Sequence, residues 1–171
     1  MKKFELTSET KINIFGKKLF RIKALVSFGV VKTGETGGWV EKEENVNQSG
    51  DAWVFGNAEV FGNARVSGDA EVSGDAEVFG NARVSGNARV SGNAEVFGNA
   101  DYTTIHGFGT QFRTTTFFRC KDKQVKVSCG CFYGTIPEFR EQVKNTRDGK
   151  IAEEYLMIAD LMEKHFAEEA K

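Results

Sequence analysis

The side chains in this sequence that could do chemistry are few: two histidines, His106 and His165, and three cysteines, Cys120, Cys129 and Cys131. The three thiols and a histidine such as His106 could together hold a zinc ion. However, the spacings C-x-C and C-x8-C match no common zinc motif. We therefore expect buried thiols on hairpin strands, no metal and no cofactor. An odd number of cysteines also fits a reducing compartment better than a disulfide framework.

A phenylalanine and a glutamate each recur every 18 residues, one on either side of a valine. Side chains alternate along a strand, so the neighbours of an inward valine point outward. An exposed stack of phenylalanines is unfavourable by up to about 2 kcal/mol per ring. We expect a homotrimer interface, the chain's own C-terminal helix or another macromolecule to cover it. Stacked glutamates repel one another and indicate either a basic neighbour or a solvated face. The predicted binding residues are Glu59, Phe61, Glu77, Phe79, Glu95 and Phe97.

These columns belong to a six-residue repeat that runs without insertion from residue 50 to residue 103. Each unit begins with Gly and then Asp or Asn, which tolerate the positive φ of a turn. Ala-x-Val-[Phe/Ser] follows in eight of the nine units and has the alternation of a short strand. The superperiod of 18 implies three unequal faces per coil, so nine units predict three full coils of a triangular solenoid. Its valine and alanine core leaves no room for a ligand inside.

The pattern Val-x-Gly-x-Ala-x resembles that of the hexapeptide-repeat proteins of the left-handed parallel β-helix superfamily. The left-handed sense of the coil comes from this resemblance alone. The flanking segments are similar to those of mostly uncharacterised hexapeptide-repeat proteins encoded by bacterial phages and prophages. The motifs that carry this second likeness are Gly37-Gly38-Trp39-Val40-Glu41, Thr114-Thr115-Thr116-Phe117-Phe118 and Cys129-Gly130-Cys131-Phe132.

Both ends of a solenoid need caps, because a bare coil exposes strand edges and core. We predict a β cap over residues 1–36 with a turn at Gly16, the β-helix over 37–103, and a β-hairpin region over 104–134. Residues 135–171 are predicted to form two helices, the first starting at Pro137 with Thr135 as its cap. The second helix, over 151–167, has an apolar stripe in which we expect His165 to be structural.

Charge is balanced overall, with 23 basic and 24 acidic residues, which excludes whole-chain nucleic-acid binding. It is nevertheless partitioned: residues 1–36 hold eight bases and three acids, and residues 50–103 hold three bases and eight acids. The solenoid should therefore repel nucleic acid. No apolar stretch approaches the roughly 18 residues needed to span a bilayer. The N-terminus has no apolar signal region, so we expect a cytoplasmic protein, in a bacterial host if a phage encodes it.

The preferred interpretation is a non-enzymatic protein, assembled as a homotrimer, that binds and blocks a host component. Its likeness to phage proteins suggests an inhibitor of antiviral defence that occludes a protein or sequesters a nucleotide signal. One alternative is a CoA-dependent acyltransferase, because many enzymes of the superfamily use a histidine base at a cleft between subunits, and His106 follows the last hexad. Against it, the hexads lack the inserted loops that build such clefts. Another alternative is a structural spacer in a virion or filament.

Overall fold

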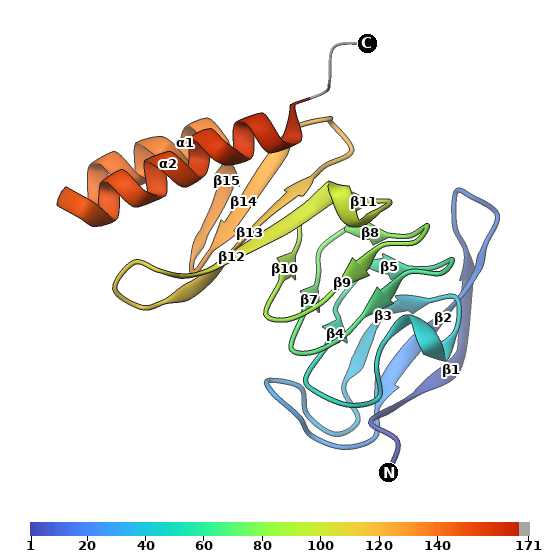
Figure 1. Ribbon diagram of the computed structural model, residues 1–171. Helices are drawn as coiled ribbons and strands as arrows, with labels where there is room; N and C mark the ends of the chain where they lie inside the picture. Colours follow the sequence, from blue (N-terminus) through green and yellow to red (C-terminus); the bar gives the residue numbers. More distant parts are fainter. Residues whose placement is uncertain (168–171) are drawn as a thin grey trace.

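The computed structural model describes residues 1–167 and shows a mainly β protein built around a β-solenoid of about three turns (Figure 1). Each side of a coil is a strand of two residues, and the turn that follows has a glycine with a φ between 60° and 70°, except after β11. The strands of the hexads are β4 (Trp53–Val54), β5 (Glu59–Val60), β6 (Arg65–Val66), β7 (Glu71–Val72), β8 (Glu77–Val78), β9 (Arg83–Val84), β10 (Arg89–Val90) and β11 (Glu95–Val96).

The strands stack in parallel into three faces, and residues 18 apart are in register, as predicted. The first face is β4-β7-β10, the second is β3-β5-β8-β11 with β3 at Thr36–Val40, and the third is β6-β9. On the second face, for example, Glu59 pairs with Glu77 and Glu77 with Glu95. The hexad valines and alanines of residues 52–96 are fully buried or nearly so. The interior is therefore packed solid, and binding sites have to lie outside it.

The solenoid begins before the first regular hexad, within the predicted range 37–103, and it ends earlier than the hexads predict. Trp39 pairs with Glu59, and Val46 forms a bridge with Val66, so a partial coil precedes the first hexad. A 3₁₀ turn, η1 (Glu43–Asn45), lies between them. The expectation of nine hexads in three full coils is wrong for the ninth unit, which leaves the third face. There the Asp101 carboxylate accepts hydrogen bonds from the backbone N–H groups of Phe97 and Gly98, and a second 3₁₀ turn, η2 (Asn99–Asp101), replaces the glycine turn.

The N-terminal cap is an antiparallel hairpin of β1 (Phe4–Ile12) and β2 (Lys18–Ala24), with Gly16 at φ 73° in its turn as predicted. Strand β2 also pairs with β3, so the hairpin continues the second face of the solenoid. At the open end of the first coil, Phe4 and Phe28 pack edge-on against the buried ring of Trp53. These three rings close the bottom of the core.

The C-terminal cap is a four-stranded antiparallel sheet in the order β12 (Tyr102–Phe108), β13 (Arg113–Arg119), β14 (Val125–Cys129) and β15 (Phe132–Thr135). The predicted hairpin around residues 121–123 is present as β13 and β14, with an additional strand on either side. The sheet sits on the last coil, where the N–H of Arg89 donates to Oγ1 of Thr116 at 3.0 Å and Ala94 bridges to Cys120.

Two helices, α1 (Ile136–Thr146) and α2 (Gly149–Phe166), cover the face of this sheet that points away from the solenoid (Figure 1). Thr135 caps α1 as predicted and forms a reciprocal capping box with Glu138. The apolar stripe of α2 differs at its end: Phe166 is buried there, whereas His165 is exposed. Within residues 1–167 neither helix has the length and hydrophobicity that crossing a membrane requires.

Candidate functional site

The predicted phenylalanine column lies on the second face, and the N-terminal hairpin covers most of it. The ring of Phe15, from the β1–β2 turn, lies 5.5 Å from that of Phe61 and 5.3 Å from that of Phe79. Phe61 is only 4% exposed and packs with Leu19 and Trp39. The expected cover by the C-terminal helix is therefore wrong. The hairpin takes this place because its strand β2 is hydrogen-bonded into the same sheet. At the end of the column, Phe97 remains 61% exposed.

The glutamate column beside it has basic neighbours within the chain. Lys11 of β1 lies 2.7 Å from Glu59, and Lys121 of the β13–β14 turn lies 2.6 Å from Glu77. Glu95 is partly buried. The basic N-terminal cap thus neutralises part of the acidic solenoid, which is consistent with the charge partition of the sequence. A binding role for these six residues stays a prediction. The column no longer argues for a trimer, because the chain itself buries Phe61.

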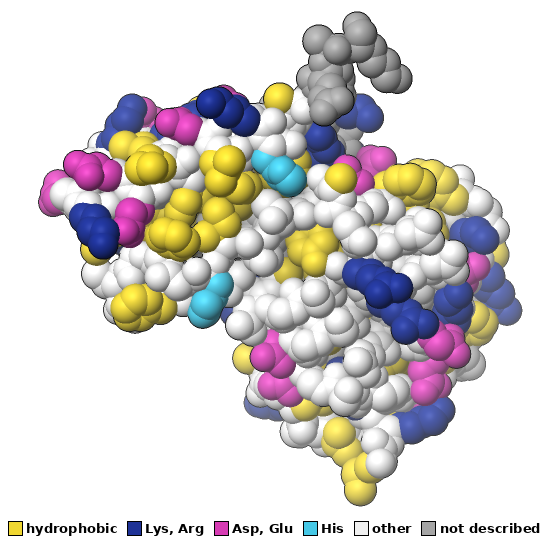
Figure 2. Space-filling model, viewed as in Figure 1, with side chains coloured by type: hydrophobic (Ala, Val, Ile, Leu, Met, Phe, Trp, Pro, Cys, Tyr) yellow, Lys and Arg dark blue, Asp and Glu magenta, His cyan; other side chains and the backbone are white. Residues whose placement is uncertain are grey.

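The first face forms the floor of an open groove of about 780 Å³. One end of the groove is bounded by Gly29 and Val30 of the N-terminal cap, and the other by the C-terminal sheet and its loops. Figure 2 shows an indentation of the surface between the solenoid and the part formed by the C-terminal sheet and helices. The polar side chains that line the groove are Asp51, Asp69, Glu71, Asn87, Arg89, His106, Arg113 and Thr114.

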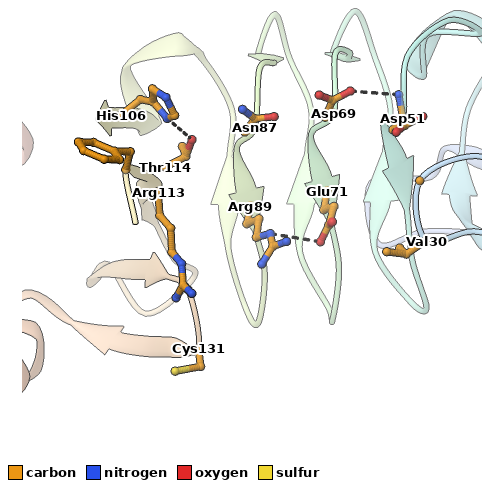
Figure 3. A pocket seen from close by; sticks show the side chains of 13 residues that line it. Val30, Asp51, Asp69, Glu71, Asn87, Arg89, His106, Arg113, Thr114 and Cys131 are labelled. Carbon is orange, nitrogen blue, oxygen red and sulfur yellow. Dashed lines mark hydrogen bonds and ion pairs between the residues drawn. The ribbon is translucent and has the colours of Figure 1, made fainter. Parts of the chain in front are cut away.

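Figure 3 shows how the solenoid arranges these side chains. Asp51, Asp69 and Asn87 occupy the same turn position in successive coils and form one row, and Glu71 and Arg89 form a second row on the strands. Glu71 and Arg89 lie 3.5 Å apart, so their charges compensate each other. Among residues 1–167, no ion pair within 4 Å involves Asp51 or Asp69. The buried ammonium of Lys3 interacts electrostatically with both carboxylates, so this end of the groove carries two negative charges that one positive charge offsets in part.

The opposite end of the groove carries positive charge. Arg113 starts β13 and lies across Gly130, so that a Cβ on that glycine would collide with its guanidinium. Next to it, Phe112 is 65% exposed and has a φ of 47°, a conformation that is rare for a bulky side chain. The groove thus has an acidic end near the N-terminal cap and a basic end at the C-terminal sheet. A complementary ligand would carry both signs of charge.

His106, the candidate catalytic base, lies on β12 and lines this groove. Its side chain is exposed, and Nδ1 lies 3.1 Å from the hydroxyl oxygen of Thr114. The imidazole is therefore accessible to a ligand in the groove. Its position bears on the acyltransferase alternative but does not by itself identify a reaction.

The three cysteines occupy different environments. Cys120 is buried, and this burial raises the pKa of its thiol to about 11. Cys129 is half-buried and accepts a hydrogen bond from Thr115, whereas Cys131 is exposed and lines the groove. The expectation of buried thiols is therefore wrong for Cys131, because it lies in the turn after β14 rather than on a strand. Residues 1–167 contain no group of three or more potential metal ligands.

Sequence reasoning identified His106 and considered Cys131, but it missed the groove residues Asp69 and Arg113.

Neither a protein-family model nor a curated protein matches the chain. The groove has opposite charges at its two ends, which fits an elongated, dipolar ligand.

Proposed function

We propose that the protein is a non-enzymatic binding protein that captures a partner in the groove of the first face and blocks it by occlusion. The observation that carries this proposal is that two faces of the solenoid differ in how far the rest of the chain covers them. The second face is covered by the chain's own hairpin, whereas the first face is left open and bounded at both ends. In addition, Asp51, Asp69 and Arg113 offer charges that form no ion pair within residues 1–167.

Rigidity supports this function. The floor of the groove is built from strands whose buried valines form a continuous core, and the wall is a sheet that is hydrogen-bonded to the last coil. Charges on such a scaffold are held in place before a partner arrives, so little ordering entropy is lost on binding. The partner's charged groups would be sequestered in the trough, which prevents their use elsewhere.

We further propose that the protein is a phage or prophage product that blocks a host component, a candidate being part of an antiviral defence system. The support for this is the resemblance of the three flanking motifs. In the structure, Gly37 and Gly38 of β3 pack closely against the first coil, and Phe118 lies in the solenoid core. Cys131, from the third motif, lines the groove.

The test is capture of a partner from bacterial lysate by tagged protein, compared with charge-reversal variants. We expect Arg113→Glu and Asp69→Lys to lose the captured partner and Arg65→Glu to retain it. Arg65 is also an exposed charge, but it lies on the third face and outside this groove, so it serves as the control. Circular dichroism should show that all three variants are folded. Capture that survives both groove substitutions would contradict the proposal.

The homotrimer stays a prediction and has its own test. Light scattering of the purified protein should give three times the chain mass of 18.9 kDa. A mass equal to that of a single chain would exclude the trimer, but it would leave the groove intact, because every residue of the groove named above belongs to one chain.

The acyltransferase alternative is favoured by one observation, the accessible imidazole of His106 in the groove. If the protein is such an enzyme, acetyl-CoA should raise its melting temperature and His106→Ala should abolish turnover without changing the fold. The binding function predicts no turnover, and capture of a partner that depends on Arg113 and Asp69.

A further inference from the structure

A second, smaller pocket opens next to the basic end of the groove. Its volume is about 100 Å³, roughly that of three water molecules. Arg113 and Cys131 line both the groove and this side pocket, so the two are adjacent. The remaining walls come from the sheet and the two helices. The apolar lining consists of Phe108, Phe132, Phe139, Val143 and the ring of Tyr155.

The side pocket is also positively charged. Its lining contains two arginines, Arg113 and Arg147, and no aspartate or glutamate. Both arginines are exposed, and neither forms an ion pair within 4 Å among residues 1–167. The guanidinium of Arg147 donates one hydrogen bond, to the carbonyl oxygen of Thr146 at 2.8 Å. Several guanidinium N–H groups are therefore free to bind a carboxylate, which they match geometrically.

Tyr155 lines the side pocket together with both arginines. Burial raises the pKa of this phenol, and the positive charges of Arg147 and Arg113 act in the opposite direction. Its hydroxyl donates to the carbonyl oxygen of Phe108 at 3.2 Å. This bond fixes the ring as one wall of the pocket. The pocket therefore combines an apolar interior with a rim that attracts anions.

We propose that the groove and the side pocket together bind the C-terminal tail of a partner protein. The last side chain of the tail, small and aliphatic, fills the side pocket, and its terminal carboxylate binds Arg113 and Arg147. Basic side chains upstream in the tail pair with Asp69 and Asp51. This inference rests on the proposed function and specifies the ligand of the same groove.

The stacking of the coils sets the spacing in the tail. Asp69 lies on the coil below that of Arg89, and Arg89 is hydrogen-bonded to β13, the strand that begins with Arg113. Two steps of about 4.8 Å therefore separate the level of the sheet from that of Asp69. An extended chain covers this distance with about three residues. The preferred tail should carry lysine or arginine about three to five positions before its last residue.

The same features disfavour a nucleotide as the ligand. A volume of about 100 Å³ is too small for a purine ring with its sugar. In addition, Asp51 and Asp69 would repel a chain of phosphates in the groove. A protein tail with basic side chains and a terminal carboxylate can pair with the charges at both ends of the groove, whereas a nucleotide can pair only with the arginines.

Fluorescent hexapeptides with free C-terminal carboxylates test this inference. The first probe has leucine in the last position and arginines three and four positions before it. A pool randomised at all six positions accompanies it, so that the result does not depend on a single sequence. We expect binding that falls by about tenfold to a hundredfold in Arg113→Gln and in Arg147→Gln, because each removes charge-assisted hydrogen bonds to the carboxylate. Asp69→Asn should weaken binding by a smaller factor, and Arg65→Gln should not change it.

Three peptide controls separate the parts of the proposal. Amidation of the C-terminus, replacement of the last leucine by tryptophan, and replacement of the arginines by glutamates should each reduce binding. The inference is overturned if amidated peptides bind as well as free carboxylates, if neither the probe nor the pool binds, or if nucleoside triphosphates compete for the site. If capture from lysate still depends on Arg113 and Asp69 while all peptides fail, the tail inference alone is wrong. If that capture also fails, the proposed function falls with it.

Discussion

Phe117 and Phe118 are consecutive in β13, and their fully buried rings belong to two different hydrophobic cores. Phe118 packs into the top of the solenoid core together with Cys120, whereas Phe117 packs under the two helices with Phe139. The alternation of side chains along a strand makes this possible. One strand thus joins the solenoid to the C-terminal sheet and helices, and it holds Arg113, at its start, in a fixed position relative to the groove.

Substituting these two residues separately should therefore have different structural consequences. We expect Phe117→Ala and Phe118→Ala each to destabilise by about 3–5 kcal/mol, as is usual for a buried ring. Native-state hydrogen exchange should show that Phe117→Ala exposes mainly the amides of α1 and α2. Phe118→Ala should instead lower the protection of the last coils. Equal loss of protection throughout the chain in both variants would show that the two cores are not separate units.

Removing the ring of Phe15 should expose the covered part of the phenylalanine column. Phe15→Ala is expected to destabilise by about 1–2 kcal/mol, because apolar area of Phe61 and Phe79 becomes accessible to water. Urea denaturation measures this change, and binding of a hydrophobic dye should increase. The matched control is Phe97→Ala, since that ring is already mostly exposed. If both variants lose the same stability, the hairpin does not cover the column as described.

Lys3 makes stability depend on pH above neutrality. Its ammonium is buried, donates to the carbonyl oxygens of Gly50 and Ala52, and has its pKa lowered by burial to about 8, from the usual 10.5. Between these two values the unfolded chain holds a proton that the folded chain has lost, so stability rises with pH. We expect the unfolding free energy of the wild type, relative to Lys3→Met, to increase from pH 8 to pH 10.5. A constant or falling difference would contradict this assignment.

The cysteines should differ strongly in their reactivity toward thiol reagents. Cys131 is exposed and should react first, whereas burial and the raised pKa of Cys120 should protect that thiol until the protein unfolds. Mass spectrometry after brief treatment with a maleimide at neutral pH identifies the labelled residue. Because Cys131 lines the groove, a bound partner should slow its labelling. Rapid modification of Cys120 in the folded protein would be inconsistent with this arrangement.

Two positions require glycine for different reasons: Gly38 because there is no space for a Cβ, and Gly86 because of its backbone conformation. A Cβ on Gly38 would lie 2.6 Å from Cγ1 of Val54 and 2.7 Å from the carbonyl oxygen of Ala58. Gly86, at φ 67°, has nothing within 4 Å of such a Cβ. We expect Gly86→Ala to cost about 1–2 kcal/mol for the left-handed conformation. Gly38→Ala should cost more, because buried backbone has to move. Thermal unfolding of both variants provides the comparison.

Much of the fold could be predicted from the hexads because each of them encodes its own local structure. The turn glycines adopt positive φ and the valines point inward, so the period of 18 translates directly into register. The last hexad was misassigned because its Tyr102 starts a strand of the antiparallel sheet instead of a third strand on the third face. A hexad motif alone does not show whether its strand pairs with the neighbouring coil or with another part of the chain.

The groove was not predictable in the same way. It joins Asp51 of the first hexad to Arg113 of the C-terminal sheet, and no local pattern connects residues that far apart. The cover of Phe61 by Phe15 is likewise a long-range contact, set by the pairing of β2 with β3. The sequence did carry one relevant signal, the excess of bases in residues 1–36 over an acidic solenoid. From this partition the sequence predicted only that the solenoid repels nucleic acid, and the ion pair between Lys11 and Glu59 was not predicted.

Both caps reach the middle one of the three coils: Phe15 of the N-terminal hairpin packs on Phe79, and Lys121 of the C-terminal sheet pairs with Glu77. Duplication or deletion of 18 residues would change the height of the solenoid by about 4.8 Å, and it would also change which coils make these two contacts. Such a step would move the acidic and basic ends of the trough apart or together by a fixed increment. The number of coils therefore sets both the length of the groove and the layer of the solenoid that the two caps hold together.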